Sequence, residues 1–130
     1  MTQKNGPLKQ VLVADDDEDM MRLLEVTLTS NDRYVLLIAR EGQEALRIAR
    51  EKKPNVIFLD VMMPRMDGFE VCRALKQDPE TKHIKIIMLT ALAQERDQQK
   101  AAELGADGYM TKPFSPIKLM DRLDKLLAES

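Results

Sequence analysis

Tryptophan is absent from this 130-residue chain, and cysteine and histidine each occur once. The single cysteine, Cys72, cannot form an internal disulfide. Its apolar neighbours on a predicted helix indicate a buried, unreactive thiol, which fits a reducing cytoplasm. The single histidine, His83, has no catalytic or metal-binding partner nearby in the sequence, so we expect it to be exposed and without a role.

No charge of one sign dominates, since 20 lysines and arginines face 22 aspartates and glutamates. This balance gives no basic patch for nucleic acid and no basic helix for a membrane surface. The polar start of the chain, residues 1–9, lacks the apolar segment of a signal peptide, and no apolar run is long enough to span a bilayer. We therefore expect a cytoplasmic protein that contacts neither nucleic acid nor membrane directly.

What the chain does contain is a series of short apolar runs that alternate with amphipathic segments. Such runs are typical of buried parallel strands, predicted here at residues 11–14, 34–39, 56–59, 84–89 and 108–111. Five strands alternating with five helices predict an α/β fold: a three-layer, doubly wound parallel sheet of strand order 2-1-3-4-5. We expect a single domain over residues 1–130, with its core at about 9–127.

The helices are predicted to bury one apolar face each. The residues expected to face the sheet are Met20 or Met21, Leu24 and Leu28 in the first helix, Ala45, Leu46 and Ala49 in the second, Phe69, Cys72 and Leu75 in the third, and Ile117 or Met120, Leu123 and Leu127 in the last. Asp67 and Glu70 form a predicted capping box at the start of the third helix. The fourth helix, residues 94–104 before Gly105, is so polar that it should be the least firmly docked.

Polar side chains stand at the carboxyl ends of four predicted strands: Asp15 and Asp16, Asp60, Thr90, and Lys112. The second strand contributes nothing to this set. In open α/β sheets ligands bind outside these strand ends. Carboxylates suit Mg²⁺, a carboxylate can attack phosphorus, and an ammonium group neutralises a transferring phosphoryl group.

Helix capping is the ordinary role of acidic residues at the start of a helix. Capping explains residues 17–19, but it explains Asp15 and Asp16 less well, because they adjoin a strand end where neighbouring carboxylates repel. A hard cation would make such a pair tolerable. Asp60 could by itself do no more than begin a turn before Pro64, but the other strand ends favour a phosphoryl-transfer site.

With these residues the chain resembles the receiver domain of two-component response regulators, from about Lys9 to Leu127. The resemblance rests on residues 11–16, 59–64, 66–68, 90–91, 105–107, and Tyr109 with 112–114. It implies that Asp60 accepts a phosphoryl group, and that Mg²⁺ is bound by Asp15, Asp16, Asp60 and the backbone carbonyl of Met62.

The resemblance also implies roles for the remaining strand-end residues. Thr90 and Tyr109 would form the switch pair, Lys112 would contact the phosphoryl group, and the Lys112–Pro113 peptide bond would be cis. The implied partners are a histidine kinase or histidine phosphotransfer protein, and a downstream protein bound by the fourth helix, fifth strand and last helix. The chain would be a monomer or a weak phosphorylation-dependent dimer, and no enzyme beyond its own phosphotransfer and self-dephosphorylation.

Three alternatives compete with a standalone receiver. Asp15 and Asp17 have the spacing of the nucleophile motif of haloacid-dehalogenase-like phosphatases, although Asp19 stands where Thr or Val is usual. A receiver that is never phosphorylated is disfavoured by the complete site. A receiver cut from a longer regulator is the third alternative: Arg122 matches transcription factors that dimerise through their last helices, but Gly108 replaces the usual acidic partner.

Two apolar residues near the predicted site bear on the lifetime of a phosphoryl group. Met62 follows Asp60 by two residues, and Leu92 follows Thr90 by two residues. In receiver domains that lose their phosphoryl group quickly, the residues at these two positions resemble each other in being polar. An apolar side chain cannot orient the attacking water, so the sequence predicts slow self-dephosphorylation.

Overall fold

The computed structural model of this chain describes residues 8–29, 33–91, 95–112 and 115–128. Within these ranges the strands are β1 (Lys9–Ala14), β2 (Tyr34–Ala39), β3 (Val56–Asp60), β4 (Lys85–Thr90) and β5 (Gly108–Thr111). The helices that alternate with them are α1 (Glu18–Thr29), α2 (Gly42–Lys52), α3 (Gly68–Gln77), α4 (Glu95–Glu103) and α5 (Pro116–Ala128). No helix in the described ranges is long and apolar enough to cross a membrane.

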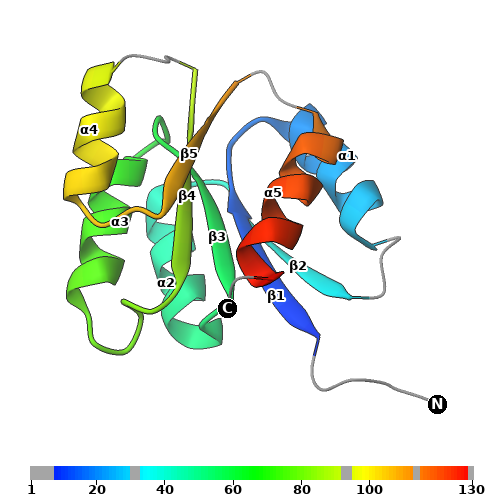
Figure 1. The fold of residues 1–130 in the computed structure, drawn as a ribbon, viewed down its shortest axis with the longest axis horizontal. Helices are drawn as coiled ribbons and strands as arrows, with labels where there is room; N and C mark the ends of the chain where they lie inside the picture. Colours follow the sequence, from blue (N-terminus) through cyan, green and yellow to red (C-terminus); the bar gives the residue numbers. More distant parts are fainter. Residues whose placement is uncertain (1–7, 30–32, 92–94, 113–114, 129–130) are drawn as a thin grey trace.

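The five strands form one parallel sheet in the order β2-β1-β3-β4-β5, which confirms the predicted topology (Figure 1). The chain first winds outward to β2 and then returns past β1 to β3, so the winding reverses between β1 and β3. In the register of the sheet, Asp60 lies opposite Leu89, and Thr90 lies opposite Thr111. The carboxyl ends of the central strands therefore meet at one edge.

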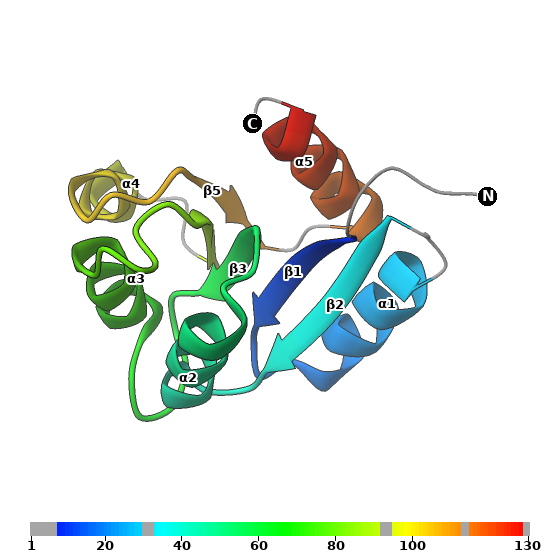
Figure 2. The same cartoon turned by 90° about the horizontal axis from the view of Figure 1, so that it is seen from below.

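Alternate residues of each strand enter two separate cores, one on each face of the sheet. Leu12, Ile57 and Met88 pack with α2, α3 and α4, whereas Val13 and Phe58 pack with α1 and α5. Figure 2 shows this division, with α2, α3 and α4 on one side of the sheet and α1 and α5 on the other. Because both faces are covered, the inner strands are apolar along their middle residues.

Most predicted inward faces are confirmed, and that of the last helix is confirmed in part, since Leu123 is buried as expected but two further leucines were not predicted. In α5 the buried residues are Leu119, Leu123 and Leu126, whereas Ile117 is 70% exposed. Met120 and Leu127 are only partly buried against the same core. Thr81, between α3 and β4, is a buried polar residue whose hydroxyl donates to the Leu75 carbonyl at 2.8 Å.

Helix α3 is firmly built into the fold. Its predicted capping box is confirmed: the Asp67 carboxylate accepts from the Glu70 amide at 2.9 Å, and the Glu70 carboxylate accepts from the Asp67 amide at 3.1 Å. Cys72 is buried, and burial raises the pKa of its thiol to about 11, as expected for an unreactive cysteine. His83 is exposed, also as predicted.

Helix α4 is as thinly docked as its polar sequence predicts. Ala101 is the one buried side chain among those that the structure describes in this helix. Gly105 follows the helix with φ of 94°, a left-handed conformation that glycine adopts without a steric penalty. Residue 94, the predicted start of the helix, lies outside the described residues.

Candidate functional site

The carboxylate of Asp15 is fully buried at the end of β1. The Asp15 amide donates to the Ala39 carbonyl at 3.0 Å, which continues the pairing of β1 with β2 beyond Ala14. Its Oδ1 atom accepts from the Asp17 amide at 3.1 Å. Its Oδ2 atom is also buried and lies 2.7 Å from Lys112 Nζ. The neighbouring Asp16 is exposed.

Asp17 caps helix α1 instead of joining the site. Its exposed carboxylate accepts from the amides of Asp19 and Met20 at 3.1 and 3.2 Å. These are the bonds of a helix N-cap, whose side chain satisfies free N–H groups of the first turn. Because Asp17 is occupied in this way, the structure argues against a phosphatase site built on Asp15 and Asp17.

Asp60 is the last residue of β3, and only 6% of its surface is exposed. Its Oδ1 atom accepts from the Met62 amide at 3.2 Å, and its Oδ2 atom accepts from Lys112 Nζ at 3.0 Å. Behind it, the Gly68 backbone packs so closely that a Cβ atom there would lie 2.3 Å from the Asp60 carbonyl oxygen. The start of α3 therefore supports the backbone of this aspartate directly.

Lys112 connects two of the carboxylates. Its Nζ atom lies 2.7 Å from Asp15 Oδ2 and 3.0 Å from Asp60 Oδ2. Burial alone would lower the pKa of Lys112, but its contacts with the two carboxylates outweigh burial and raise it. Sequence reasoning placed this lysine at the site but did not identify it as their counter-ion.

Burial also governs the titration of Asp60. It raises the pKa of the carboxyl from 3.8 to about 6, while the Lys112 hydrogen bond opposes the shift and the charge of Asp15 adds to it. A carboxyl with this pKa is mostly ionised at neutral pH, and it is a stronger base than an ordinary aspartate.

The structure gathers the three predicted metal-binding carboxylates. One oxygen each from Asp15, Asp16 and Asp60 can be chosen so that all three lie within 4.8 Å of one another. Hard oxygen donors of this kind match the ligand preference of Mg²⁺. The three carboxylates repel one another, and Lys112 contacts only two of them, so a bound cation would offset the remaining repulsion.

Thr90 and Tyr109 occupy neighbouring strands on the same part of the sheet. Thr90, 6% exposed, ends β4, and its carbonyl accepts from the Lys112 amide at 2.7 Å. Tyr109 is partly buried in β5 opposite Met88. The predicted cis peptide at Pro113 and the predicted role of Leu92 concern positions outside the described residues.

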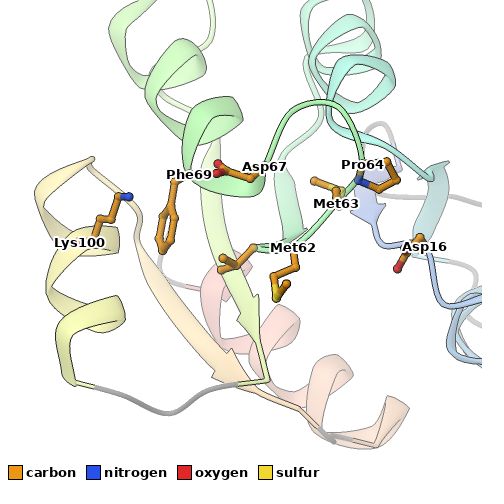
Figure 3. A pocket seen from close by; sticks show the side chains of 8 residues that line it. Asp16, Met62, Met63, Pro64, Asp67, Phe69 and Lys100 are labelled. Atoms are coloured by element: carbon orange, nitrogen blue, oxygen red, sulfur yellow. The ribbon is translucent and has the colours of Figure 1, made fainter.

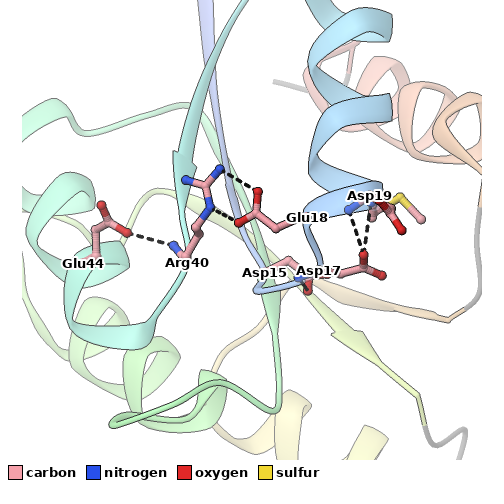
Figure 4. Close-up of polar contacts among 7 residues, drawn as sticks. Asp15, Asp17, Glu18, Asp19, Arg40 and Glu44 are labelled. Atoms are coloured by element: carbon pink, nitrogen blue, oxygen red, sulfur yellow. Dashed lines mark hydrogen bonds and ion pairs between the residues drawn. The ribbon is translucent and has the colours of Figure 1, made fainter.

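Arg40, which directly follows β2, is a charged residue that sequence reasoning missed. Its Nε and Nη2 atoms contact the Glu18 carboxylate at 2.5 and 3.2 Å, and its amide donates to Glu44 at 2.8 Å (Figure 4). The ion pair lowers the pKa of Glu18. These contacts join Arg40 to the starts of α1 and α2 and not to the strand-end residues of the site, so the expectation that the second strand adds nothing to that set stays a prediction.

The loop between β3 and α3 is tightly seated against α2. A Cβ atom on Gly42 would lie 1.9 Å from the Met66 carbonyl oxygen, so only glycine permits this approach. Arg65, with φ of 72°, is a rare left-handed non-glycine residue, and its guanidinium lies 3.4 Å from the Glu41 carboxylate. In front of this loop is a hollow of about 610 Å³ that reaches from Asp16 to Lys100 (Figure 3).

The chain matches the family model of the response regulator receiver domain over residues 11–124. Among curated proteins the chain is 44% identical over 122 residues to PhoP of Bacillus subtilis, an alkaline phosphatase synthesis transcriptional regulatory protein. It is also 44% identical over 117 residues to the response regulator PleD of Caulobacter vibrioides. These alignments cover 94% and 90% of this chain but only 50% and 26% of the two relatives.

Among solved structures the chain is similar to the chemotaxis response regulator CheY4 of Vibrio cholerae. The TM-score is 0.85 at 32% sequence identity, and the match covers 92% of this chain and 99% of that one. A response regulator from Chloroflexus aurantiacus matches with a TM-score of 0.84 at 34% identity, over 94% of this chain and 99% of that one.

Proposed function

Because this chain belongs to the receiver domains of two-component response regulators, we propose that Asp60 is its phosphoacceptor. Members of this family generally accept a phosphoryl group and are not themselves enzymes. The observation that carries the assignment is the position of Asp60: it ends the central strand β3, has a carboxylate oxygen on Lys112, and shares a cluster with Asp15 and Asp16. The donor would be a histidine kinase or a histidine phosphotransfer protein.

The transfer requires Asp60 to act as an ionised nucleophile. A carboxylate oxygen of Asp60 forms the new bond to phosphorus while the bond from phosphorus to the donor's imidazole nitrogen breaks, and the electron pair returns to that nitrogen. The raised pKa, about 6, leaves this oxygen ionised at neutral pH but more basic than usual. Lys112, whose Nζ atom lies 3.0 Å from Asp60 Oδ2, would donate to an oxygen of the transferred group.

We further propose that Asp15, Asp16, Asp60 and the backbone carbonyl of Met62 hold Mg²⁺. The carboxylate cluster supports this assignment. A bound Mg²⁺ would supply positive charge that offsets the oxygens of the phosphoryl group. Asp16→Asn should weaken Mg²⁺ binding while relieving repulsion in the metal-free protein, and thermal melting unaffected by millimolar Mg²⁺ would count against the site.

The proposed output is a change in the face formed by α4, β5 and α5. A phosphoryl group on Asp60 would draw the Thr90 hydroxyl toward it through a charge-assisted hydrogen bond, leaving space for the Tyr109 ring to turn inward. The altered face would control a downstream protein in the cytoplasm, without direct contact to nucleic acid or membrane, and the chain would be a monomer or a weak phosphorylation-dependent dimer. The activity of a longer regulator carrying this domain would be set elsewhere in that protein.

The test is phosphorylation by acetyl phosphate followed by mass spectrometry of the intact protein. Wild type with Mg²⁺ should gain one phosphoryl group, and EDTA or Asp60→Asn should prevent the gain. Asp17→Asn is the matched control, because the same chemical change at a nearby helix cap should leave phosphorylation intact. Phosphorylation that persists in Asp60→Asn would refute the assignment.

A further inference from the structure

The carboxyl end of α4 is tied firmly to the sheet and to α3. The Ala106 amide donates to the Ala101 carbonyl at 3.0 Å, which closes the end of the helix. The Asp107 amide donates to the Ile86 carbonyl at 2.8 Å, and the Asp107 carboxylate accepts from the Ile86 amide at 2.8 Å and from Lys76 Nζ at 3.1 Å. This network fixes the segment after α4 to β4 and α3.

The middle of α4 makes a weaker contact with α3. The ammonium group of Lys100 lies 4.6 Å from the centre of the Phe69 ring, a cation–π contact that Figure 3 shows from the side of the hollow. Lys100 is exposed, and Ala101 is the one buried side chain among those described in the helix. At an exposed site such a contact shifts a conformational equilibrium by only about two- to fivefold.

The Phe69 side chain, in contrast, is held firmly in place. It is 8% exposed and follows Gly68, whose amide donates to the Val61 carbonyl at 2.9 Å. Its position is also held by the capping box at Asp67 and Glu70. The ring is therefore joined through a few rigid residues to the backbone of Asp60, whereas its partner on α4 belongs to a loosely docked helix.

We propose that the Lys100–Phe69 contact is a latch that holds α4 in its resting position and opens when the site is phosphorylated. The inference rests on the proposed role of Asp60. Strand β4 ends at Thr90, and α4 begins at Glu95, five residues later in the sequence, so a displacement of Thr90 toward the phosphoryl group would also move the amino end of α4. Because the other end is anchored, α4 pivots near Gly105, which moves Lys100 off a ring that cannot follow.

The contact itself can be tested in the unphosphorylated protein by amide hydrogen exchange. Lys100→Met keeps an unbranched side chain of similar helix propensity but removes the charge. It should speed exchange in α4 by about two- to fivefold relative to α3, because opening becomes easier by that factor. Lys118→Met, at an exposed lysine of α5, is the matched control and should leave α4 unchanged.

Beryllofluoride with Mg²⁺, a mimic of the phosphoryl group, tests the regulatory role. If activation must open the latch, the mimic should bind Lys100→Met about two- to fivefold more tightly than wild type. Faster exchange in α4 with unchanged affinity for the mimic would overturn the latch, since the contact would then be structural only. Failure of the mimic to bind wild type would overturn the proposed role of Asp60 as well.

Discussion

Helices α3 and α4 cover the same face of the sheet but are held very differently. Helix α3 buries Phe69, Val71, Cys72 and Leu75 and begins with a complete capping box, whereas Ala101 is the one buried side chain described in α4. The rigid helix supports the proposed phosphoacceptor, and the loosely held helix belongs to the proposed output face. Stability is thus concentrated where chemistry requires precise positions and is low where a conformational response is needed.

The largest effect on the rigid side should come from Lys112→Met. This change removes the cation that lies 2.7 and 3.0 Å from two buried carboxylates. Breaking a buried pair costs about 3–5 kcal/mol, and the partial exposure of Lys112 places the expected loss at the lower end of that range. Urea unfolding of the metal-free protein at neutral pH measures it, with Lys118→Met as the control; equal stabilities of the Lys112 variant and wild type would contradict the assigned charge balance.

The next largest effect is the change in the free energy of unfolding with pH that the titration of Asp60 causes. It should stay below about 3 kcal/mol. The pKa of Asp60 is about 6 in the folded protein against 3.8 ordinarily, so the folded state binds this proton more tightly than the unfolded state. The resulting stabilisation is present at low pH and is lost as the pH rises through about 6. In metal-free protein, the difference between wild type and Asp60→Asn in free energy of unfolding should therefore decrease across that window, and a difference independent of pH would show that Asp60 titrates normally.

The lifetime of a phosphoryl group on Asp60 should depend on two apolar residues, Met62 after β3 and Leu92 between β4 and α4 in the sequence. Met62 is 72% exposed beside Asp60, and Leu92 lies outside the described residues. Since neither apolar side chain can orient water, wild type should keep its label for many minutes. Met62→Asn with Leu92→Glu should accelerate decay by about ten- to a hundredfold. Loss of radiolabel from purified phosphoprotein measures the rate, and a wild-type half-life of seconds would refute the prediction.

The smallest effect should come from Gly105→Ala, at the end of the loosely held helix. A residue with a Cβ atom pays about 1–2 kcal/mol in the left-handed conformation that Gly105 adopts. Gly105→Asn should lose less stability than Gly105→Ala, because asparagine adopts the left-handed conformation more readily than alanine. Hydrogen exchange should accelerate in α4 and leave α3 unchanged; an equal response of both helices would mean that they unfold together.

The topology and the strand-end residues could be predicted from sequence because each depends on a local pattern. Apolar runs followed by Asp15, Asp60 or Thr90 identify the strands and their carboxyl ends without knowledge of the partners. The inward face of α5 could be predicted only in part: Leu123 was identified, but Leu119 and Leu126 were not. Its apolar residues occur at positions 117, 119, 120, 123, 126 and 127, which allow more than one amphipathic face, and packing against the sheet and α1 selects among them.

Contacts between residues far apart in sequence were equally inaccessible. Arg40 meets Glu18 across 22 residues, and Lys112 meets Asp60 across 52. Only the folded sheet sets these distances, because β1 lies between β2 and β3 and thereby brings separate loops to one edge. The pKa of Asp60 belongs to the same class, since its burial and its neighbours are products of the whole fold.

The buried thiol of Cys72 offers a way to time the local opening of the anchored end of α4. Its Sγ atom lies 3.9 Å from the Leu104 carbonyl, at the seam between α3 and the end of α4, and the chain has no second cysteine. A thiol reagent can modify Cys72 only while that seam is open, and the thiolate is scarce when the seam is closed because its pKa is about 11. When the seam closes faster than the reagent reacts, the labelling rate is proportional to the fraction of molecules in which the seam is open. The rate at Cys72 therefore measures this opening without an engineered probe.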